Sequence, residues 1–470
     1  MRADSLKRAQ ESHFGGEESK NQTPAAYTKA SRRHTVSSHI PATYVESADM
    51  SAFTKATWRL LPFLFVCYLF AYLDRINVAF AKLQMLSDLG FSEAVYGFGA
   101  SVFFVGYLLF EVPSNLLLLR VGPRRWIARI MVTWGLISAA MMFVNTPTMF
   151  YVMRFLLGIA EAGFFPAIVL YLTYWFPASR RSKVTALFLT GIPMSGVIGG
   201  PLSGWIMTAF NGSHGFAGWQ WLFLVEGVPT ALLGIVAFFY LDDKVRDAKW
   251  LSEEQKDLIE EKLKEEAPAS ALHSLKDGLL SPKVLLVSAV YFFYTMGLYG
   301  VSFWLPTLIK SSGVSDPFHV GLLTAVPYAA GALAMVLVSH NSDRTGERRW
   351  HLIVPGLVGA FGLAMSVWFS GSTLAAMIAL TVGTMGVMTT ISQFWVIPPA
   401  FLGGAAAAAG LALANSVGSI SGVVSPSLIG VIKQASGSAG AGVLALAVSL
   451  VIGGLLVLFV PAALVNNRRR

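Results

Sequence analysis

Six ionisable residues stand inside the long apolar stretches of the first half of this 470-residue chain, and four of them, two arginines and two acids, could form one site. Asp74 and Arg75 are neighbours in one stretch, and Arg154 and Glu161 lie seven positions apart in another. A charged side chain at the centre of a bilayer costs about 2.5–3.5 kcal/mol on insertion scales, so such residues normally face a cavity or a charged partner. Guanidinium groups bind carboxylates through two parallel hydrogen bonds and keep their proton, whereas a carboxyl group can take one up. This combination predicts a site that binds an anion and exchanges protons.

Helical geometry limits how these four side chains can meet. Residues seven apart share a helix face and are separated by about 10.5 Å along the axis, so Arg154 and Glu161 can each reach a different partner. We expect Arg154 to face Asp74 and Arg75 to face Glu161, or either arginine to bind the substrate. With both acids ionised the arginines carry no spare charge, and protonation of one acid would free an arginine for an anion. The alternative is an ion pair that only ties the two helices together.

The composition places these residues in a membrane protein. Hydrophobic residues make up 54% of the chain and charged residues only 13%, against about 25% charged in a typical soluble domain. Twelve apolar runs are each long enough to cross a hydrocarbon core of about 30 Å as a helix, and in lipid a helix satisfies its own backbone polar groups. The runs lie near residues 58–80, 94–118, 126–144, 148–175, 183–209, 219–241, 283–309, 317–339, 350–370, 373–398, 405–432 and 439–465. The predicted fold is an all-α polytopic membrane protein with twelve transmembrane helices.

A basic heptapeptide occurs twice, about half a chain apart. Arg120-Val-Gly-Pro-Arg-Arg-Trp126 returns as Arg344-Thr-Gly-Glu-Arg-Arg-Trp350, each time between two apolar runs. Such a repeat indicates two homologous six-helix halves, which we place at residues 58–241 and 283–465, and repeats of this kind usually enclose a substrate site at their interface. The chain is therefore predicted to move a solute across the bilayer.

The segments outside the halves are polar. Residues 1–57 have the composition of a disordered tail, and residues 466–470 form a short basic tail. Residues 242–282 are predicted to be a cytoplasmic linker. Within it, Ser252-Glu-Glu-Gln255 resembles a capping box, which predicts a short amphipathic helix at the membrane surface.

Basic residues gather at one side of the predicted array, and the positive-inside rule therefore places both termini in the cytoplasm. The opposite loops carry little beyond Lys82, Lys310 and Lys433. Because the basic residues stand at helix ends and not on one soluble face, nucleic acid is not an expected partner. The sequence also has no phosphate-binding loop of the Gly-Lys-Ser/Thr type and no clustered metal-ligand pattern, so we expect neither a cofactor nor a metal.

The repeated turn resembles the loop signature of the major facilitator superfamily. The matching residues are Arg120, Gly122, Arg124 and Arg125 in the first copy and Asp343, Arg344, Gly346, Arg348 and Arg349 in the second. The first copy has Leu119 where that family usually has Asp. Another acid must then pair with its arginines, and Glu111 is the candidate, which we interpret as a structural partner of the loop.

A narrower resemblance, over residues 55–465, is to the anion:cation symporter family. It is carried by Tyr72-Leu-Asp-Arg-Ile-Asn77, Phe110-Glu-Val-Pro-Ser-Asn115, Arg154-Phe-Leu-Leu-Gly-Ile-Ala-Glu-Ala-Gly163, Phe303-Trp-Leu-Pro306, Phe394-Trp395 and Asn415-Ser416. The resemblance implies import of a small organic anion with protons across a bacterial inner membrane. Tartrate, a sugar acid or another hydroxy or aromatic carboxylate is the expected substrate. An anion exchanger without net proton movement and a non-transporting membrane sensor are the alternatives.

The same resemblance implies residue roles. Asp74 and Glu161 match the proton-coupling acids, and the expected substrate-binding residues are Tyr72, Arg75, Arg154, Ser392, Trp395 and Asn415. Polar residues such as Ser392 and Asn415 are equally suited to hydrogen bonds between helices, and only the resemblance favours substrate contact. Glu226, just before Gly227 and Pro229, is interpreted as structural. We expect a monomer with no enzymatic activity.

Overall fold

The structure is a computed structural model that describes residues 42–265, 281–398 and 404–466. The predicted tail up to residue 41, the later part of the predicted linker and the basic end from residue 467 lie outside the described residues. The contacts divide the chain into two units, Met1–Glu46 and Ser47–Arg470.

The described residues contain twelve helical segments long and apolar enough to span a membrane, which confirms the predicted fold class. The α-helices are α1 (Ala42–Leu89), α2 (Glu93–Val121), α3 (Pro123–Ala140), α4 (Pro147–Glu161), α5 (Phe164–Thr173), α6 (Ala178–Leu189), α7 (Gly191–Ala209), α8 (Gly218–Tyr240), α9 (Glu253–Glu265), α11 (Pro282–Ser311), α12 (Pro317–Thr345), α13 (Arg349–Trp368), α14 (Thr373–Phe394), α16 (Gly404–Ser436), α17 (Gly440–Val457) and α18 (Ala462–Val465). The fourth span consists of α4 and α5, and the fifth span combines the end of α6 with α7.

Helix ends follow local signals in the sequence. The Ser92, Ser281 and Asp316 side chains accept hydrogen bonds from the first turns of α2, α11 and α12, which satisfies N–H groups that have no partner within the helix. Several ends differ from the predicted runs; for example, α1 begins at Ala42, well before residue 58, and α17 ends at Val457, before residue 465. Polar residues extend α1 beyond its apolar run, and hydropathy alone does not detect such an extension.

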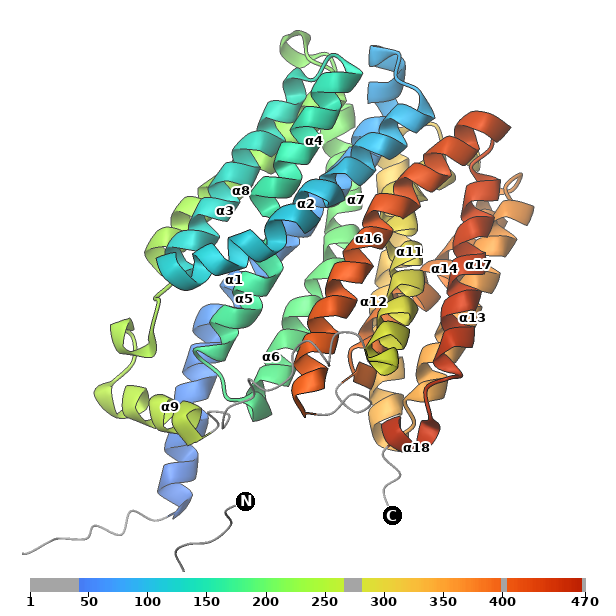
Figure 1. The fold of residues 1–470 in the computed structure, drawn as a ribbon. Helices are drawn as coiled ribbons and strands as arrows, with labels where there is room; N and C mark the ends of the chain where they lie inside the picture. The colour runs from blue at the N-terminus through green and yellow to red at the C-terminus, as the bar shows by residue number, and fades with distance from the viewer. Residues whose placement is uncertain (1–41, 266–280, 399–403, 467–470) are drawn as a thin grey trace, which may run out of the picture. The chain divides into compact units, whose positions relative to one another are not determined.

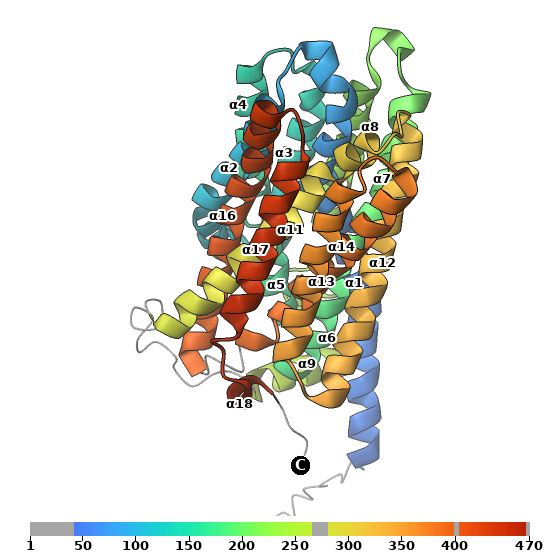
Figure 2. The same ribbon diagram turned by 90° about the vertical axis from the view of Figure 1, so that its right-hand side faces the viewer.

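The helices form two bundles that meet along two seams. In the first bundle α3 packs on α8 and α2 on α4, and in the second α13 packs on α14 and α17. Across the seams, α7 packs on α12 and α2 on α16, as Figures 1 and 2 show. The backbones approach closely there, since a Cβ atom on Gly321 would lie 2.2 Å from the Gly200 carbonyl oxygen. Small residues therefore hold the two halves together along their length.

The predicted amphipathic helix is present as α9. Ser252 accepts a hydrogen bond from the Gln255 backbone (3.3 Å), and the Gln255 side chain accepts one from the Ser252 backbone (3.2 Å), which together form the predicted capping box. Ile259 is fully buried. Outside the membrane, Arg246 binds the α9 carboxylates of Asp257 and Glu260, and hydrogen bonds to these acids raise the pKa of Arg246.

Candidate functional site

The centre of the site is an ion pair between two helices of the first half. Arg75 of α1 and Glu161, the last residue of α4, form a hydrogen-bonded salt bridge. The Glu161 side chain is 1% exposed and that of Arg75 is 14% exposed. The rings of Tyr72, Phe103 and Tyr107 surround the guanidinium, with centroids 5.6, 5.6 and 5.7 Å from its carbon. The predicted contact between Arg75 and Glu161 is therefore present.

The helix carrying Glu161 is interrupted immediately after this residue. Ala162 leaves the helical region (φ −53°, ψ 129°), and Gly163 adopts a left-handed conformation with φ 85°. A Cβ atom on Gly163 would also lie 2.3 Å from the Ser114 hydroxyl oxygen, whose proton is donated to the Ala162 carbonyl at 2.7 Å. The negative end of the α4 dipole lies at the break, where it favours the Arg75 cation. The hydropathy of the run 148–175 does not reveal this break, and Gly163 is the local signal in the sequence that is consistent with it.

The second arginine, Arg154, is buried and forms no ion pair with any of the described residues. Arg154 is 0% exposed, and its Nε donates to the Gly99 carbonyl at 3.3 Å. Neither terminal nitrogen, Nη1 nor Nη2, has a hydrogen-bond partner among the described residues. Its guanidinium carbon lies 4.9 Å from the Phe103 ring, which Arg75 also contacts. Two guanidinium groups thus share one aromatic ring.

The predicted contact between Arg154 and Asp74 is wrong. Asp74 instead accepts hydrogen bonds from Trp134 (2.7 Å) and Ser138 (3.0 Å) of α3, and from Thr230 (2.7 Å) of α8. Adjacent residues on a helix point about 100° apart, so Asp74 faces α3 and α8 while Arg75 faces α4. These donors could not be recognised from the sequence because they are neutral residues of α3 and α8, at least 60 positions from Asp74.

Two hydrogen bonds join the halves near the charged residues. The amide of Asn415 on α16 donates to Glu111 of α2 at 3.0 Å, and the Tyr72 hydroxyl lies 3.2 Å from that of Ser302 on α11. The expected pairing of Glu111 with the loop arginines is therefore wrong. Glu111 is 5% exposed, and its side chain faces the seam, not the loop that follows α2.

The other two predicted residues of the second half make contacts within that half. The Ser392 hydroxyl donates to the Thr389 carbonyl of its own helix at 2.9 Å. The Trp395 ring lies 5.0 Å from that of Tyr291 on α11. Their predicted role as substrate contacts remains a proposal.

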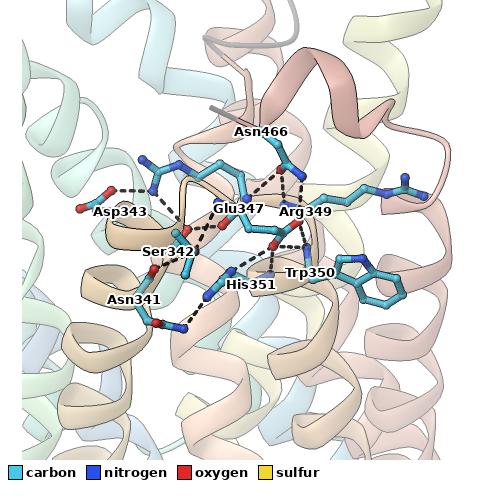
Figure 3. A network of polar contacts seen from close by, with 10 residues as sticks. Asn341, Ser342, Asp343, Glu347, Arg349, Trp350, His351 and Asn466 are labelled. Atoms are coloured by element: carbon cyan, nitrogen blue, oxygen red, sulfur yellow. Dashed lines mark hydrogen bonds and ion pairs between the residues drawn. The ribbon is translucent and has the colours of Figure 1, made fainter. Parts of the chain in front are cut away.

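The second copy of the basic turn forms a polar network between α12 and α13 (Figure 3). Arg348 pairs with Asp343 at 2.6 Å, while Asn466 accepts from the Arg348 backbone N–H at 2.8 Å and donates to Glu347 at 3.0 Å. Burial opposes ionisation of Glu347, but hydrogen bonds from Trp350, His351 and Asn466 outweigh it and lower the pKa of this carboxyl. Arg344 is exposed, and Gly346 (φ 67°) ends α12 in the left-handed conformation.

The first copy repeats these contacts with other residues. Asp243, which follows α8, accepts from the Arg124 backbone N–H at 2.9 Å, in the place that Asn466 takes in the second half. The Arg124 side chain donates to the Phe238 carbonyl at 2.5 Å, as Arg349 donates to that of Leu458 at 2.7 Å. Arg120 and Arg125 are exposed. A Cβ atom on Gly122 would lie 2.9 Å from the Asp243 Oδ1 atom, so a glycine leaves room for this carboxylate. Asp243 thus takes the place of Asn466 in the first turn, and it lies too far along the chain to be recognised from the motif.

At the opposite end, the three lysines set apart by the sequence analysis connect the halves. Glu93 at the start of α2 pairs with Lys82 of α1 at 2.7 Å and with Lys433 of α16. Lys310 of α11 donates to the Leu83 carbonyl of α1 at 2.9 Å. The Lys82 ammonium also lies 3.5 Å from the centroid of the Trp304 ring. These contacts close the seam at the end away from the basic turns.

Known proteins are similar to this chain in sequence and in fold. The family model of the Major Facilitator Superfamily matches residues 64–426. The chain belongs to this superfamily. It is a multi-pass membrane transporter and not an enzyme. A solved D-xylose-proton symporter has the same fold, with a TM-score of 0.68 at 16% identity over 86% of this chain and 98% of that one.

Relatives within the superfamily are much more similar in sequence. A putative metabolite transport protein, NicT, of Pseudomonas putida is 48% identical over 90% of this chain and 97% of its own length. A putative tartrate transporter of Agrobacterium vitis is 47% identical over 86% of this chain and 90% of its own length. This chain is therefore similar to these transporters over nearly their whole length.

Proposed function

We propose that this transporter imports a small hydroxycarboxylate of the tartrate type together with protons across a bacterial inner membrane. The observation that supports the proposal is the pair of buried guanidinium groups beside Phe103. Arg75 is neutralised by Glu161, whereas the terminal nitrogens of Arg154 have no partner among the described residues. The names of the tartrate-transporter relatives point to the same substrate class.

Arg154 is the residue best suited to receive the first carboxylate. A buried polar group without a hydrogen bond costs free energy, and a buried charge without a partner costs more. A carboxylate that accepts from both Nη1 and Nη2 would remove that cost and satisfy the fixed fork of the guanidinium. An uncharged solute would leave the charge of Arg154 uncompensated, so the site selects anions.

Glu161 couples this binding to a proton. While Glu161 is ionised, it occupies Arg75 and competes with an anionic substrate for that guanidinium. A proton added to the Glu161 carboxylate removes the competing charge, and Arg75 can then bind a second carboxylate or a hydroxyl of the substrate. Binding of the proton and of the anion therefore favour each other, which is the thermodynamic basis of symport.

Residues of the second half would close over the substrate hydroxyls. Tyr72 and Asn415 lie at the seam, where they contact Ser302 and Glu111, and each can exchange that contact for one to a substrate. Ser392 lies in the last turn of α14, and Trp395 follows the last residue of this helix. Alternating access requires these seam contacts to open and reform as one half rocks against the other.

Uptake of labelled tartrate into proteoliposomes tests the proposal. A pH gradient, acidic outside, is expected to drive accumulation above the external concentration, and Arg154→Lys is expected to lose most of the uptake because an ammonium cannot reproduce the fork. Uptake only when unlabelled tartrate is present inside would support the exchanger instead. Absence of uptake and exchange of every hydroxycarboxylate tested would refute the proposal.

A further inference from the structure

A second carboxyl group is buried near Asp74 and has no role in the scheme above. Glu226 of α8 is 2% exposed. The Ser203 hydroxyl of α7 donates to its Oε1 at 2.8 Å, but its Oε2 has no hydrogen-bond partner among the described residues. Asn77 of α1 is 0% exposed, and its Oδ1 is likewise without a partner in the described part of the chain.

Asn77 and Thr230 connect the two acids. The Asn77 amide nitrogen lies 3.5 Å from Asp74 Oδ1, and Asn77 is also within hydrogen-bond reach of Glu226. The Thr230 hydroxyl lies 2.7 Å from Asp74 Oδ2 and 3.1 Å from the Glu226 backbone carbonyl. Asp74 and Glu226 therefore belong to one polar cluster between α1, α3, α7 and α8.

Among the described residues, the cluster contains no cation to balance two negative charges. From α1, Glu226 faces Asp74 and Asn77, and from α7 it faces Ser203. The α3 residues that bind Asp74, Trp134 and Ser138, are neutral. Asp74 is the one charged or titratable group, among those described, that acts electrostatically on Glu226. Two neighbouring carboxylates in such a place repel each other and lose their hydration, so one of them must hold a proton.

The hydrogen bonds decide which acid holds it. Asp74 accepts from Trp134, Ser138 and Thr230 at 2.7–3.0 Å, and donors of this kind stabilise an ionised carboxylate. Glu226 accepts one hydrogen bond, at 2.8 Å from Ser203, and Asn77 is the other side chain among the described residues within hydrogen-bond reach of it. A proton on Glu226 Oε2 would turn that atom into a donor, and Asn77 Oδ1 is an acceptor without a partner. A protonated Oε2 and Asn77 Oδ1 thus offer a donor and an acceptor within one cluster, while the Asn77 amide nitrogen stays beside Asp74.

We propose that Glu226 is a proton-binding residue of this transporter and is protonated in the conformation described, with Asp74 ionised beside it. The pair holds one proton: when it moves, the Glu226 Oε2–H bond breaks, an O–H bond forms on Asp74, and the total charge is unchanged. The proton thereby moves to the helix that carries Arg75. The link to transport rests on the proposed function, whereas the protonation of Glu226 does not.

Infrared difference spectroscopy on the purified full-length protein at neutral pH tests the protonation without a substrate. Subtracting the spectrum of Glu226→Gln from that of the wild type should leave a carboxylic-acid C=O band that shifts in D2O. The same subtraction with Asp74→Asn should leave carboxylate bands. Gln retains an acceptor for Ser203, and matching thermal melting curves would show that each variant is folded.

The opposite pattern, a carboxylate lost with Glu226→Gln and a carboxylic acid lost with Asp74→Asn, would overturn the proposal. If Glu226→Gln fails to fold, Ser203→Ala provides a second test. Removal of the hydroxyl that donates to Oε1 should shift the frequency of the same C=O band, and an unchanged band frequency would count against Glu226 as its source.

Transport then tests whether the proton takes part in the cycle. Glu226→Gln is expected to exchange labelled tartrate across proteoliposomes but to lose accumulation driven by a pH gradient. If Glu226 is purely structural, tartrate uptake by Glu226→Gln depends on pH as it does in the wild type. That result would refute the role of Glu226 in coupling. If the wild type transports no tartrate at all, the proposed function fails while the infrared result still stands.

Discussion

Replacing Glu161 by Gln isolates the coupling between proton and anion. Glutamine has nearly the same shape and keeps a carbonyl oxygen that can accept from Arg75, but it has no charge and does not titrate. In the structure Glu161 is 1% exposed and bonded to Arg75, so the substitution removes the group that competes with an anion for this guanidinium. The variant should resemble the protonated transporter at every pH.

The size of the effect follows from linkage. One proton bound together with the anion changes the binding free energy by about 1.36 kcal/mol for each pH unit, which is about tenfold in affinity. Wild-type tartrate affinity should therefore rise about tenfold for each unit of acidification across the range in which Glu161 titrates. In Glu161→Gln this dependence should be absent, and the affinity should match the acidic value of the wild type.

Isothermal titration calorimetry, repeated from mildly acidic to mildly alkaline pH, measures how the tartrate affinity of the wild type and of Glu161→Gln changes with pH. Glu254→Gln provides a matched control because Glu254 is an exposed acid on α9, outside the membrane; it should keep the wild-type slope. The reasoning is refuted if Glu161→Gln retains the wild-type dependence of tartrate affinity on pH.

Three further predictions concern the elements around the site. Gly163→Ala should abolish transport and lower the yield of folded protein, because φ is 85° and the added carbon would meet Ser114; Gly371→Ala, where no atom lies within 4 Å, should be normal in both assays. Asp243→Ala should lower the free energy of unfolding by about 0.5–2 kcal/mol, because the Arg124 backbone N–H in the first turn of α3 loses its acceptor. Asp243→Asn should retain this hydrogen bond, and equal losses of stability in both variants would contradict its contribution. Glu93→Gln should lengthen the distance between spin labels placed at the ends of α2 and α16 that carry Glu93 and Lys433, because it weakens both lysine pairs. An unchanged distance distribution would show that these pairs do not hold the two ends together.

The sequence predicted the membrane architecture well because each span depends on a property summed over many residues. Twelve apolar runs and one repeated turn were sufficient for the fold class, and the structure confirms them. The break after Glu161 could not be predicted in this way. It depends on the backbone conformation of Ala162 and Gly163 and on one hydrogen bond from Ser114, and neither alters the hydropathy of the run.

Pairings within the site were predicted only in part. Seven-residue spacing correctly allowed Arg75 to reach Glu161, but the same spacing could not show that Asp74 turns toward α3 and α8. Glu111 was assigned to the loop by proximity along the chain, whereas its partner Asn415 lies on the other half. Contacts between residues hundreds of positions apart depend on how the helices rotate and pack, and a single sequence does not encode that in any local pattern.

The most direct test of proton-coupled transport is the movement of protons with the anion. Proteoliposomes containing a pH-sensitive dye are given a tartrate gradient, higher outside, with equal pH on both sides and the membrane potential clamped. The account predicts that the lumen acidifies as tartrate enters, and that Glu161→Gln abolishes this acidification while tartrate exchange continues. Tartrate entry without any change in luminal pH would contradict it.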